Sequence, residues 1–281
     1  MMNKITWLLL LSIFPLSLIS QTSNSAQTEK GKPSDAFNKL MIMGREGKYD
    51  SVIIIGSQLL NEQPNYTGLL KIRGLAYLQL ADYLSAYKDF SSATSLSPDS
   101  SDYWFLQAFA AEKAELTNEA KMSIERSLLL NDKKAQAWYI KGNLLTKEDK
   151  LDEALNCYNR AIGLQKGYAD ALAMKGYILY RRGENPIAIE TLQLAIAADN
   201  QFSLPYFYIG LCYLEDEKPS DALKSFDNAM RLGYDEGDLY HYRGLAMLQL
   251  RRFDDACDMW KEAVLRGYTL SKAMSKRYCR H

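Results

Sequence analysis

A small residue recurs at a fixed interval of 34 residues through most of this chain of 281 residues. Its six occurrences are Gly74, Ala108, Gly142, Gly176, Gly210 and Gly244. Twelve residues after each of them stands an alanine, and these alanines are Ala86, Ala120, Ala154, Ala188, Ala222 and Ala256. Such a period is typical of proteins in which short units stack, because one unit cannot bury its own apolar face. The interval therefore predicts a stacked repeat protein.

Bulky side chains keep the same register. They stand four residues before each small residue, as Leu70, Trp104, Trp138, Leu172, Tyr206 and Tyr240, and four residues after each alanine, as Phe90, Ile124, Tyr158, Leu192, Phe226 and Trp260. Spacings of three and four residues place side chains on one face of a helix. Each unit is therefore predicted to contain two amphipathic helices, A and B. The glycine of helix A is expected to let the alanine of helix B approach closely.

The register also predicts the domain organisation. Six clear repeats are expected at residues 67–100, 101–134, 135–168, 169–202, 203–236 and 237–270. A degenerate repeat at residues 33–66 precedes them, so the array covers residues 35–270. Residues 271–281 begin like another helix A and are expected to cap the apolar face of the last repeat.

This pattern resembles the tetratricopeptide repeat. The residues that carry the resemblance best are Trp138, Gly142, Ala154, Tyr158 and Ala161. The resemblance implies an all-α fold, a right-handed superhelical solenoid of antiparallel helix pairs. It also implies that the A helices line the concave wall.

The N-terminal segment has a different character from the array. Lys4 precedes an apolar run at residues 5–19, and Ser20 and Gln21 form a plausible cleavage point. The run is shorter than the ~20 residues of a membrane span, and Pro15 interrupts it. Residues 1–20 are therefore predicted to be a secretory signal peptide, with an uncleaved membrane anchor as the alternative. Residues 21–34 are expected to be a disordered spacer, and the mature protein to be periplasmic or secreted.

Four cysteines allow three disulfide connectivities, and the sequence alone does not choose among them. Cys257 lies on helix B of the last repeat and Cys279 on the expected cap, so a bond between them would pin the cap. The segment from Ala256 to Cys279 also resembles the C-terminal repeat of exported repeat proteins of the Bacteroidetes. Cys157 and Cys212 are expected to be separate buried thiols, without the spacing of metal ligands.

The sequence offers little for catalysis. It contains no nucleotide-binding, zinc-protease or serine-hydrolase motif, and its two histidines are His241 and His281. The 34 basic residues balance the 34 acidic ones, so no net field attracts a nucleic acid. We expect no enzyme activity, no cofactor, no metal site, no nucleic-acid partner and no small-molecule substrate.

The positions next to the packing residues of the A helices are expected to face the concave groove. They include Phe105, Phe109, Tyr139, Asn143, Tyr177, Phe207 and His241, and Tyr180 and Arg181 follow a turn later on one of these helices. An aromatic groove suits an extended peptide or a partner helix. The alternative is that these rings only thicken the interface between successive A helices.

Three functions agree with this pattern. The leading hypothesis is a non-catalytic protein–protein interaction scaffold that binds a peptide or partner helix in its concave groove. The second is a structural subunit of a cell-envelope or secretion assembly, docking through its convex face or its ends. Binding of a glycan is a third, because aromatic rings also stack on sugars. A membrane contact is expected only through an uncleaved leader.

Overall fold

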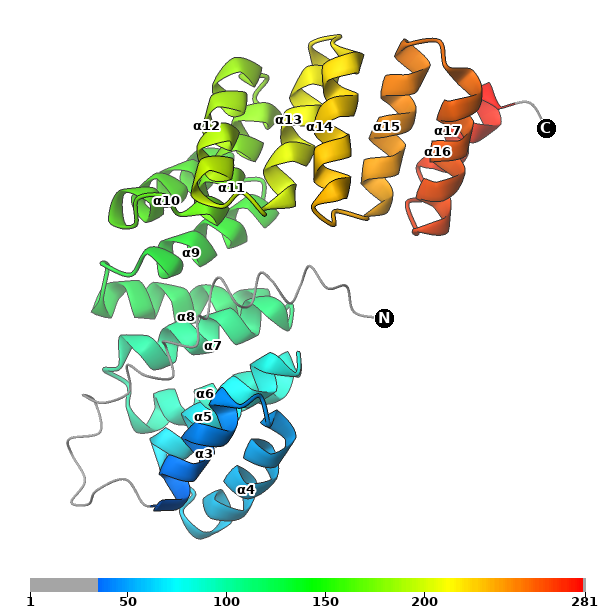
Figure 1. Cartoon of the computed structure of the whole chain (residues 1–281). Coiled ribbons are helices and arrows are strands. Elements are labelled where there is room, and N and C mark those ends of the chain that lie inside the picture. The colour runs from blue at the N-terminus through cyan, green and yellow to red at the C-terminus, as the bar shows by residue number, and fades with distance from the viewer. Residues whose placement is uncertain (1–34, 280–281) are drawn as a thin grey trace. The chain divides into compact units, whose positions relative to one another are not determined.

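The computed structural model describes residues 35–279, and this part of the chain contains fifteen α-helices and no strand (Figure 1). The expected all-α repeat fold is thereby confirmed. The predicted signal peptide and spacer, residues 1–34, lie outside the described residues. The helices are α3 (Asp35–Arg45), α4 (Tyr49–Glu62), α5 (Thr67–Gln79), α6 (Tyr83–Leu96), α7 (Ser101–Lys113), α8 (Thr117–Leu130), α9 (Ala135–Lys147), α10 (Leu151–Leu164), α11 (Ala169–Arg181), α12 (Asn185–Ala198), α13 (Ser203–Glu215), α14 (Pro219–Arg231), α15 (Gly237–Gln249), α16 (Phe253–Leu265) and α17 (Ser271–Tyr278).

The helices begin where the repeat register places them. The first residues of the six expected repeats are also the first residues of helices α5, α7, α9, α11, α13 and α15, and α17 begins at the first residue of the expected cap. Each of these A helices precedes a B helix after a short turn. One residue of each turn, in the same register position, has a left-handed backbone; these residues are Ala81, Glu115, Asp149, Gly183, Glu217 and Arg251.

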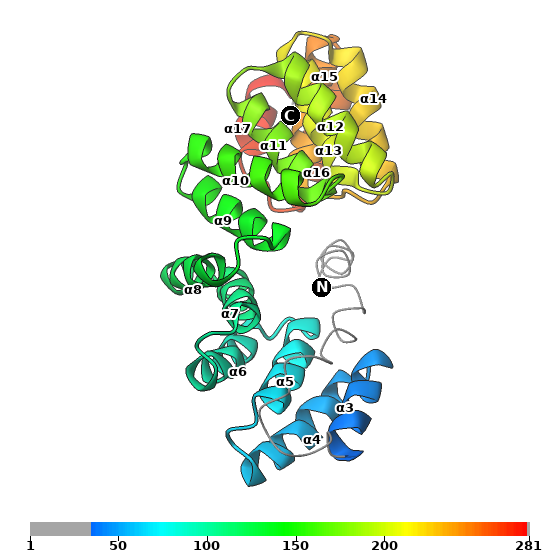
Figure 2. The ribbon, with the colours of Figure 1, turned by 90° about the vertical axis from the view of Figure 1, so that its left-hand side faces the viewer.

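The chain divides into two compact units, and the division falls between Cys157 and Tyr158, inside α10. In the N-terminal unit, helices α3 to α9 follow one another along the stack (Figure 2). In the C-terminal unit, helices α13 to α16 stand side by side, and α17 packs on α16 (Figure 1). Within both units, the helices of one pair pack on each other and on the next pair.

We call the small residues and the alanines that recur every 34 residues the ladder. Its glycines make room for a different side chain from the one expected. A Cβ atom added to Gly210 would lie 2.4 Å from Cε1 of Phe226, and one added to Gly74 would lie 2.7 Å from Cε1 of Phe90. The nearest atoms thus belong to the bulky residue of helix B, and not to its alanine. The alanine is fully buried beside this contact, as Ala222 is. The ladder is therefore a packing device: a ring or branched side chain of helix B rests on the bare backbone of helix A.

Candidate functional site

The candidate groove residues of the N-terminal unit divide into two groups. Phe105 and Phe109 on α7 are buried, with exposed fractions of 3% and 1%. Nζ of Lys134 lies 4.4 Å from the centre of the Phe105 ring, and Nζ of Lys113 lies 5.6 Å from the Phe109 ring. The two phenylalanines therefore pack between helices, as the alternative interpretation proposes. Tyr139 and Asn143 on α9 are half-buried and reach the surface.

The candidate residues of the C-terminal unit are also of two kinds. Phe207 on α13 and His241 on α15 are buried. Tyr177 and Tyr180 on α11 are half-buried, and Arg181 is exposed. Nη1 of Arg181 donates a hydrogen bond of 3.0 Å to the hydroxyl of Tyr177, so this arginine extends the aromatic surface.

The rings of this unit form one continuous cluster. It consists of Tyr177, Phe207, Tyr208, Tyr234, His241, Tyr242 and Tyr268, which we call the C-terminal aromatic cluster. Ring centres are 5.1 Å apart between Tyr177 and Tyr208, and 4.8 Å apart between Phe207 and Tyr234. His241 continues the chain of contacts to Tyr268 at 5.0 Å. The cluster thus runs from α11 to the turn before α17.

Sequence reasoning assigned only three of these seven residues to the groove. Tyr208 and Tyr242 are 34 residues apart, and so are Tyr234 and Tyr268. This spacing of 34 residues is the sequence signal by which these four tyrosines could have been assigned to the cluster. Tyr234 and Tyr268 lie in the turns after α14 and α16, and their rings reach Phe207 of α13 and His241 of α15.

Hydroxyl groups give the cluster a polar lining. The Tyr234 hydroxyl donates a hydrogen bond of 3.2 Å to Oδ2 of Asp238, and the backbone N–H of Leu239 donates one of 2.8 Å to Oδ1. Burial raises the pKa of Tyr208, Tyr234 and Asp238. The phenols therefore remain protonated at neutral pH, and the Tyr234 hydroxyl donates its proton within the cluster, to Asp238.

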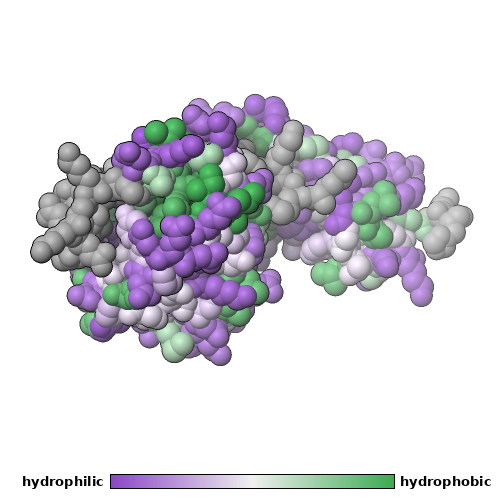
Figure 3. All heavy atoms as spheres, turned by 90° about the horizontal axis from the view of Figure 1, so that it is seen from below, coloured by the Kyte–Doolittle hydropathy of each residue, from purple (hydrophilic) through white to green (hydrophobic). Residues whose placement is uncertain are grey.

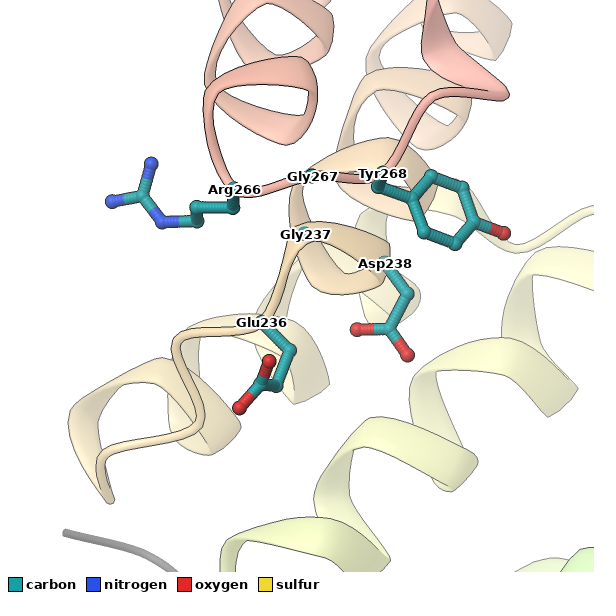
Figure 4. Close-up of a pocket in the computed structure, with 6 residues that line it drawn as sticks. All are labelled: Glu236, Gly237, Asp238, Arg266, Gly267 and Tyr268. Carbon is teal, nitrogen blue, oxygen red and sulfur yellow. The ribbon is translucent and has the colours of Figure 1, made fainter. Parts of the chain in front are cut away.

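A shallow hollow of about 270 Å³ lies at the C-terminal edge of this cluster. Glu236, Gly237 and Asp238 line it from the start of α15, and Arg266, Gly267 and Tyr268 line it from the turn after α16 (Figure 4). The guanidinium of Arg266 points away from Asp238 and Tyr268, because it bonds to Asp235 at 3.0 Å and to Glu262. The hollow is smaller than most pockets that enclose a small molecule.

One serine–histidine pair occurs in this unit, but it lies inside the packing. Nδ1 of His241 is 2.8 Å from Oγ of Ser271, and Ser271 is fully buried. Burial lowers the pKa of His241, so its ring is neutral at pH 7. The serine hydroxyl faces no solvent, and the pair therefore serves as a structural hydrogen bond between α15 and α17.

Residues 35–279 hold no group of three histidine, cysteine or acidic side chains that could bind a metal ion. No helix in this range is both long and apolar enough to cross a membrane.

The four cysteines form one disulfide and two free thiols. Cys257 on α16 and Cys279 after α17 are joined by a disulfide, with Cα atoms 5.7 Å apart. Cys157 and Cys212 are free and buried. Burial raises the pKa of the Cys212 thiol to about 12, so it is unreactive at neutral pH.

Comparisons with known proteins agree with this architecture. The sequence pattern of the tetratricopeptide repeat matches residues 135–168, whereas no curated protein matches the sequence. The structure is similar to the APC/C hetero-tetramer Cut9–Hcn1, with a TM-score of 0.75 and 14% identity over 86% of this chain; the match spans 48% of that chain. It is also similar to a tetratricopeptide repeat protein from Parabacteroides merdae ATCC 43184, with a TM-score of 0.68 and 16% identity over 87% of this chain and 99% of that chain.

A third similar structure is that of YrrB, described as a tetratricopeptide-repeat protein with an unusual peptide-binding site. Its TM-score is 0.52, with 18% identity over 70% of this chain and 97% of that chain. Identities this low show a shared fold and nothing more. Together with the repeat matched at residues 135–168, they show that the chain has the fold of tetratricopeptide-repeat proteins.

Proposed function

We propose that the chain is a non-catalytic scaffold that holds an extended peptide or a helix of a partner protein against its A helices. The observation that carries this proposal is the C-terminal aromatic cluster. It offers rings from α11, α13 and α15 and from two turns on one side of the unit. Tyrosine and tryptophan are enriched where protein surfaces bind partners, because they combine a large apolar area with a polar tip.

In each unit taken by itself, the members of the predicted groove that reach the surface form part of the binding surface that we propose. These are Tyr139 and Asn143 in the N-terminal unit, and Tyr177, Tyr180 and Arg181 in the C-terminal unit. The buried rings of Phe105, Phe109, Phe207 and His241 would support them from below. The peptide-binding site named in the description of YrrB is consistent with this use of the fold.

Site-specific photo-cross-linking tests the proposal. A photoreactive phenylalanine analogue is placed at Tyr139, Tyr177 or Tyr180 on the A helices, and at Met122 or Leu194 on the B helices as matched exposed positions. We expect the A-helix positions to cross-link one and the same protein in the native host, and the B-helix positions not to. Cross-links from the B helices alone would contradict the groove assignment.

A second function is favoured by the distribution of exposed apolar side chains. Ten large apolar residues on the B helices of the described chain are exposed; they are Ile54, Leu84, Leu96, Met122, Leu129, Leu164, Ile187, Leu194, Phe253 and Leu265. Met122 and Leu129 lie two turns apart on one face of α8, as Ile187 and Leu194 do on α12. Figure 3 shows one face of the molecule, on which hydrophobic residues form small groups between hydrophilic ones. A structural subunit of a cell-envelope or secretion assembly would use these positions, and the same cross-linking experiment identifies it.

We also propose that the protein is exported, on the strength of the sequence of residues 1–20. N-terminal sequencing of the protein recovered from the native cell checks this. A mature chain that begins near Gln21 supports export with cleavage, whereas a chain that keeps residues 1–20 supports the anchor.

A further inference from the structure

Helix α17 begins in the register of an A helix, and it is fixed at its two ends. At its start, Ser271 is fully buried and bonds to His241 of α15. At its end, Cys279 is bonded to Cys257 of α16, and the ring centre of Tyr278 lies 5.9 Å from that of Trp260. Among the described residues, the disulfide is thus the one covalent cross-link between the end of α17 and the preceding helix.

The rest of α17 contributes little to its own attachment. Ser271 is its single buried residue, and Lys272, Lys276 and Arg277 point into solvent. The helix has eight residues, fewer than an isolated helix needs to be stable in water. Its position therefore depends on the contacts at its ends and on the side chains of Met274 and Tyr278.

The surface under α17 is apolar. Met274, Tyr278 and Cys279 cover a cluster that includes Met247 and Trp260, whose exposed fractions are 7% and 0%. In the preceding repeats the corresponding place is taken by the next A helix, as α15 packs on α14. Movement of α17 would therefore uncover a face to which a helix fits.

We propose that the Cys257–Cys279 bond is a redox latch that controls this cap. When the bond is closed, α17 covers the end of the array. When a dithiol reduces the bond, the C-terminal part of α17 leaves α16, while the pairs from α11 to α16 remain folded. Gly244 of α15 packs directly on Trp260 of α16, so this contact within the repeat does not need the bond, although Tyr278 of α17 also lies against the Trp260 ring.

Reduction of the Cys257–Cys279 bond proceeds by two steps of thiol–disulfide exchange. A thiolate of the dithiol attacks Sγ of Cys279, which is half-buried, whereas Cys257 is 8% exposed. The disulfide breaks and Cys257 leaves as a thiolate. The second thiol of the reductant then attacks the mixed disulfide, releases Cys279 as a thiolate and closes a cyclic disulfide. Two electrons thus pass to the protein, and the dithiol is oxidised to a cyclic disulfide. The two cysteine sulfurs take up protons to the extent that their pKa values allow.

Hydrogen exchange on the full chain, with and without dithiothreitol, tests the latch. We expect the amides of α17 to exchange at least tenfold faster after reduction, and those of α13 and α14 to keep their rates. The double variant Cys257→Ser with Cys279→Ser should behave like the reduced protein and should not respond to dithiothreitol. This unresponsive variant controls for effects of the reductant elsewhere in the chain.

Two results would overturn the proposal. Unchanged protection of α17 in the reduced protein would mean that packing alone holds the cap. Loss of protection throughout α11 to α16 would mean that the bond staples the whole unit and does not act locally. Both results are independent of whether the A helices bind a partner.

Discussion

The two ends of the array depart from the regular packing in different ways. Near the N-terminus, Arg73 of α5 bonds to Asp89 of α6 through Nε at 2.9 Å and Nη2 at 2.7 Å, and to Ser57 of α4 at 2.9 Å. At the C-terminus, a disulfide and the His241–Ser271 hydrogen bond attach α17. One end thus uses an ion pair and the other a covalent bond.

The N-terminal pair accompanies an irregular position in the array. In the degenerate repeat, Gly56 stands in the position that Phe90 occupies one repeat later. The stem of Arg73 fills the space, since a Cβ atom on Gly56 would lie 3.6 Å from Cβ of Arg73. At the other end of the described residues, α17 packs on α16 and is cross-linked to it. Each of these two regions thus adds a specific bond to the packing that all repeats share.

The largest predicted effect is that of replacing an interior glycine of the ladder with alanine. Gly210→Ala puts a methyl group 2.4 Å from Cε1 of Phe226, so the helices must separate. We expect a loss of about 3 kcal/mol in the free energy of unfolding of the C-terminal unit, at the upper end of overpacking effects. Urea denaturation followed by circular dichroism measures it. In the background of Phe226→Ala, which removes the ring, the same change should cost much less, and an equal cost in both backgrounds would contradict the contact.

The next effect concerns the N-terminal ion pair. Asp89→Asn keeps the shape of the side chain but removes the charge opposite Arg73, which is 19% exposed. A buried charge without its partner is costly, and we expect a loss of about 2 kcal/mol after allowing for this exposure. Asp258→Asn, which breaks the exposed pair with Lys261, is the matched control and should leave the unfolding midpoint unchanged. Equal midpoints for the two variants would exclude a role of the pair in stability.

The ladder shows how much of this architecture the sequence predicts. Identical spacing in every repeat gave the first residue of each A helix, because one packing contact recurs at each interval. The burial of Phe105, Phe109, Phe207 and His241 was not predictable, since it depends on how closely successive A helices pack. The Arg73–Asp89 pair was not predictable either, because Asp89 has no acidic counterpart in the other repeats, and Arg243, which repeats the position of Arg73, pairs with Asp227 instead.

The C-terminal end should depend on pH as well as on redox conditions. Burial lowers the pKa of His241 below its usual value of about 6.5, with Tyr242 and Tyr268 against the ring and Ser271 on Nδ1. The unfolded chain then binds a proton more readily, so stability present above pH 6.5 is lost as the pH falls. We expect the melting temperature to fall between pH 7.5 and 5.5, and His241→Gln to reduce that fall. His281→Gln should retain it, and equal behaviour of both variants would refute the role of His241.

The smallest predicted effect comes from Gly56 in the irregular first repeat, and it can be compared directly with that of Gly210 in the regular interior. Gly56→Ala makes the same change as Gly210→Ala, but its methyl group meets Arg73 only at 3.6 Å, an ordinary contact. Because alanine favours the helix over glycine, we expect the variant to gain about 0.5–1 kcal/mol in stability. Thermal denaturation of the two variants side by side should therefore give shifts of opposite sign. A loss at both positions would show that Gly56 is a packing glycine like the others, and that Arg73 does not replace a bulky residue of the ladder.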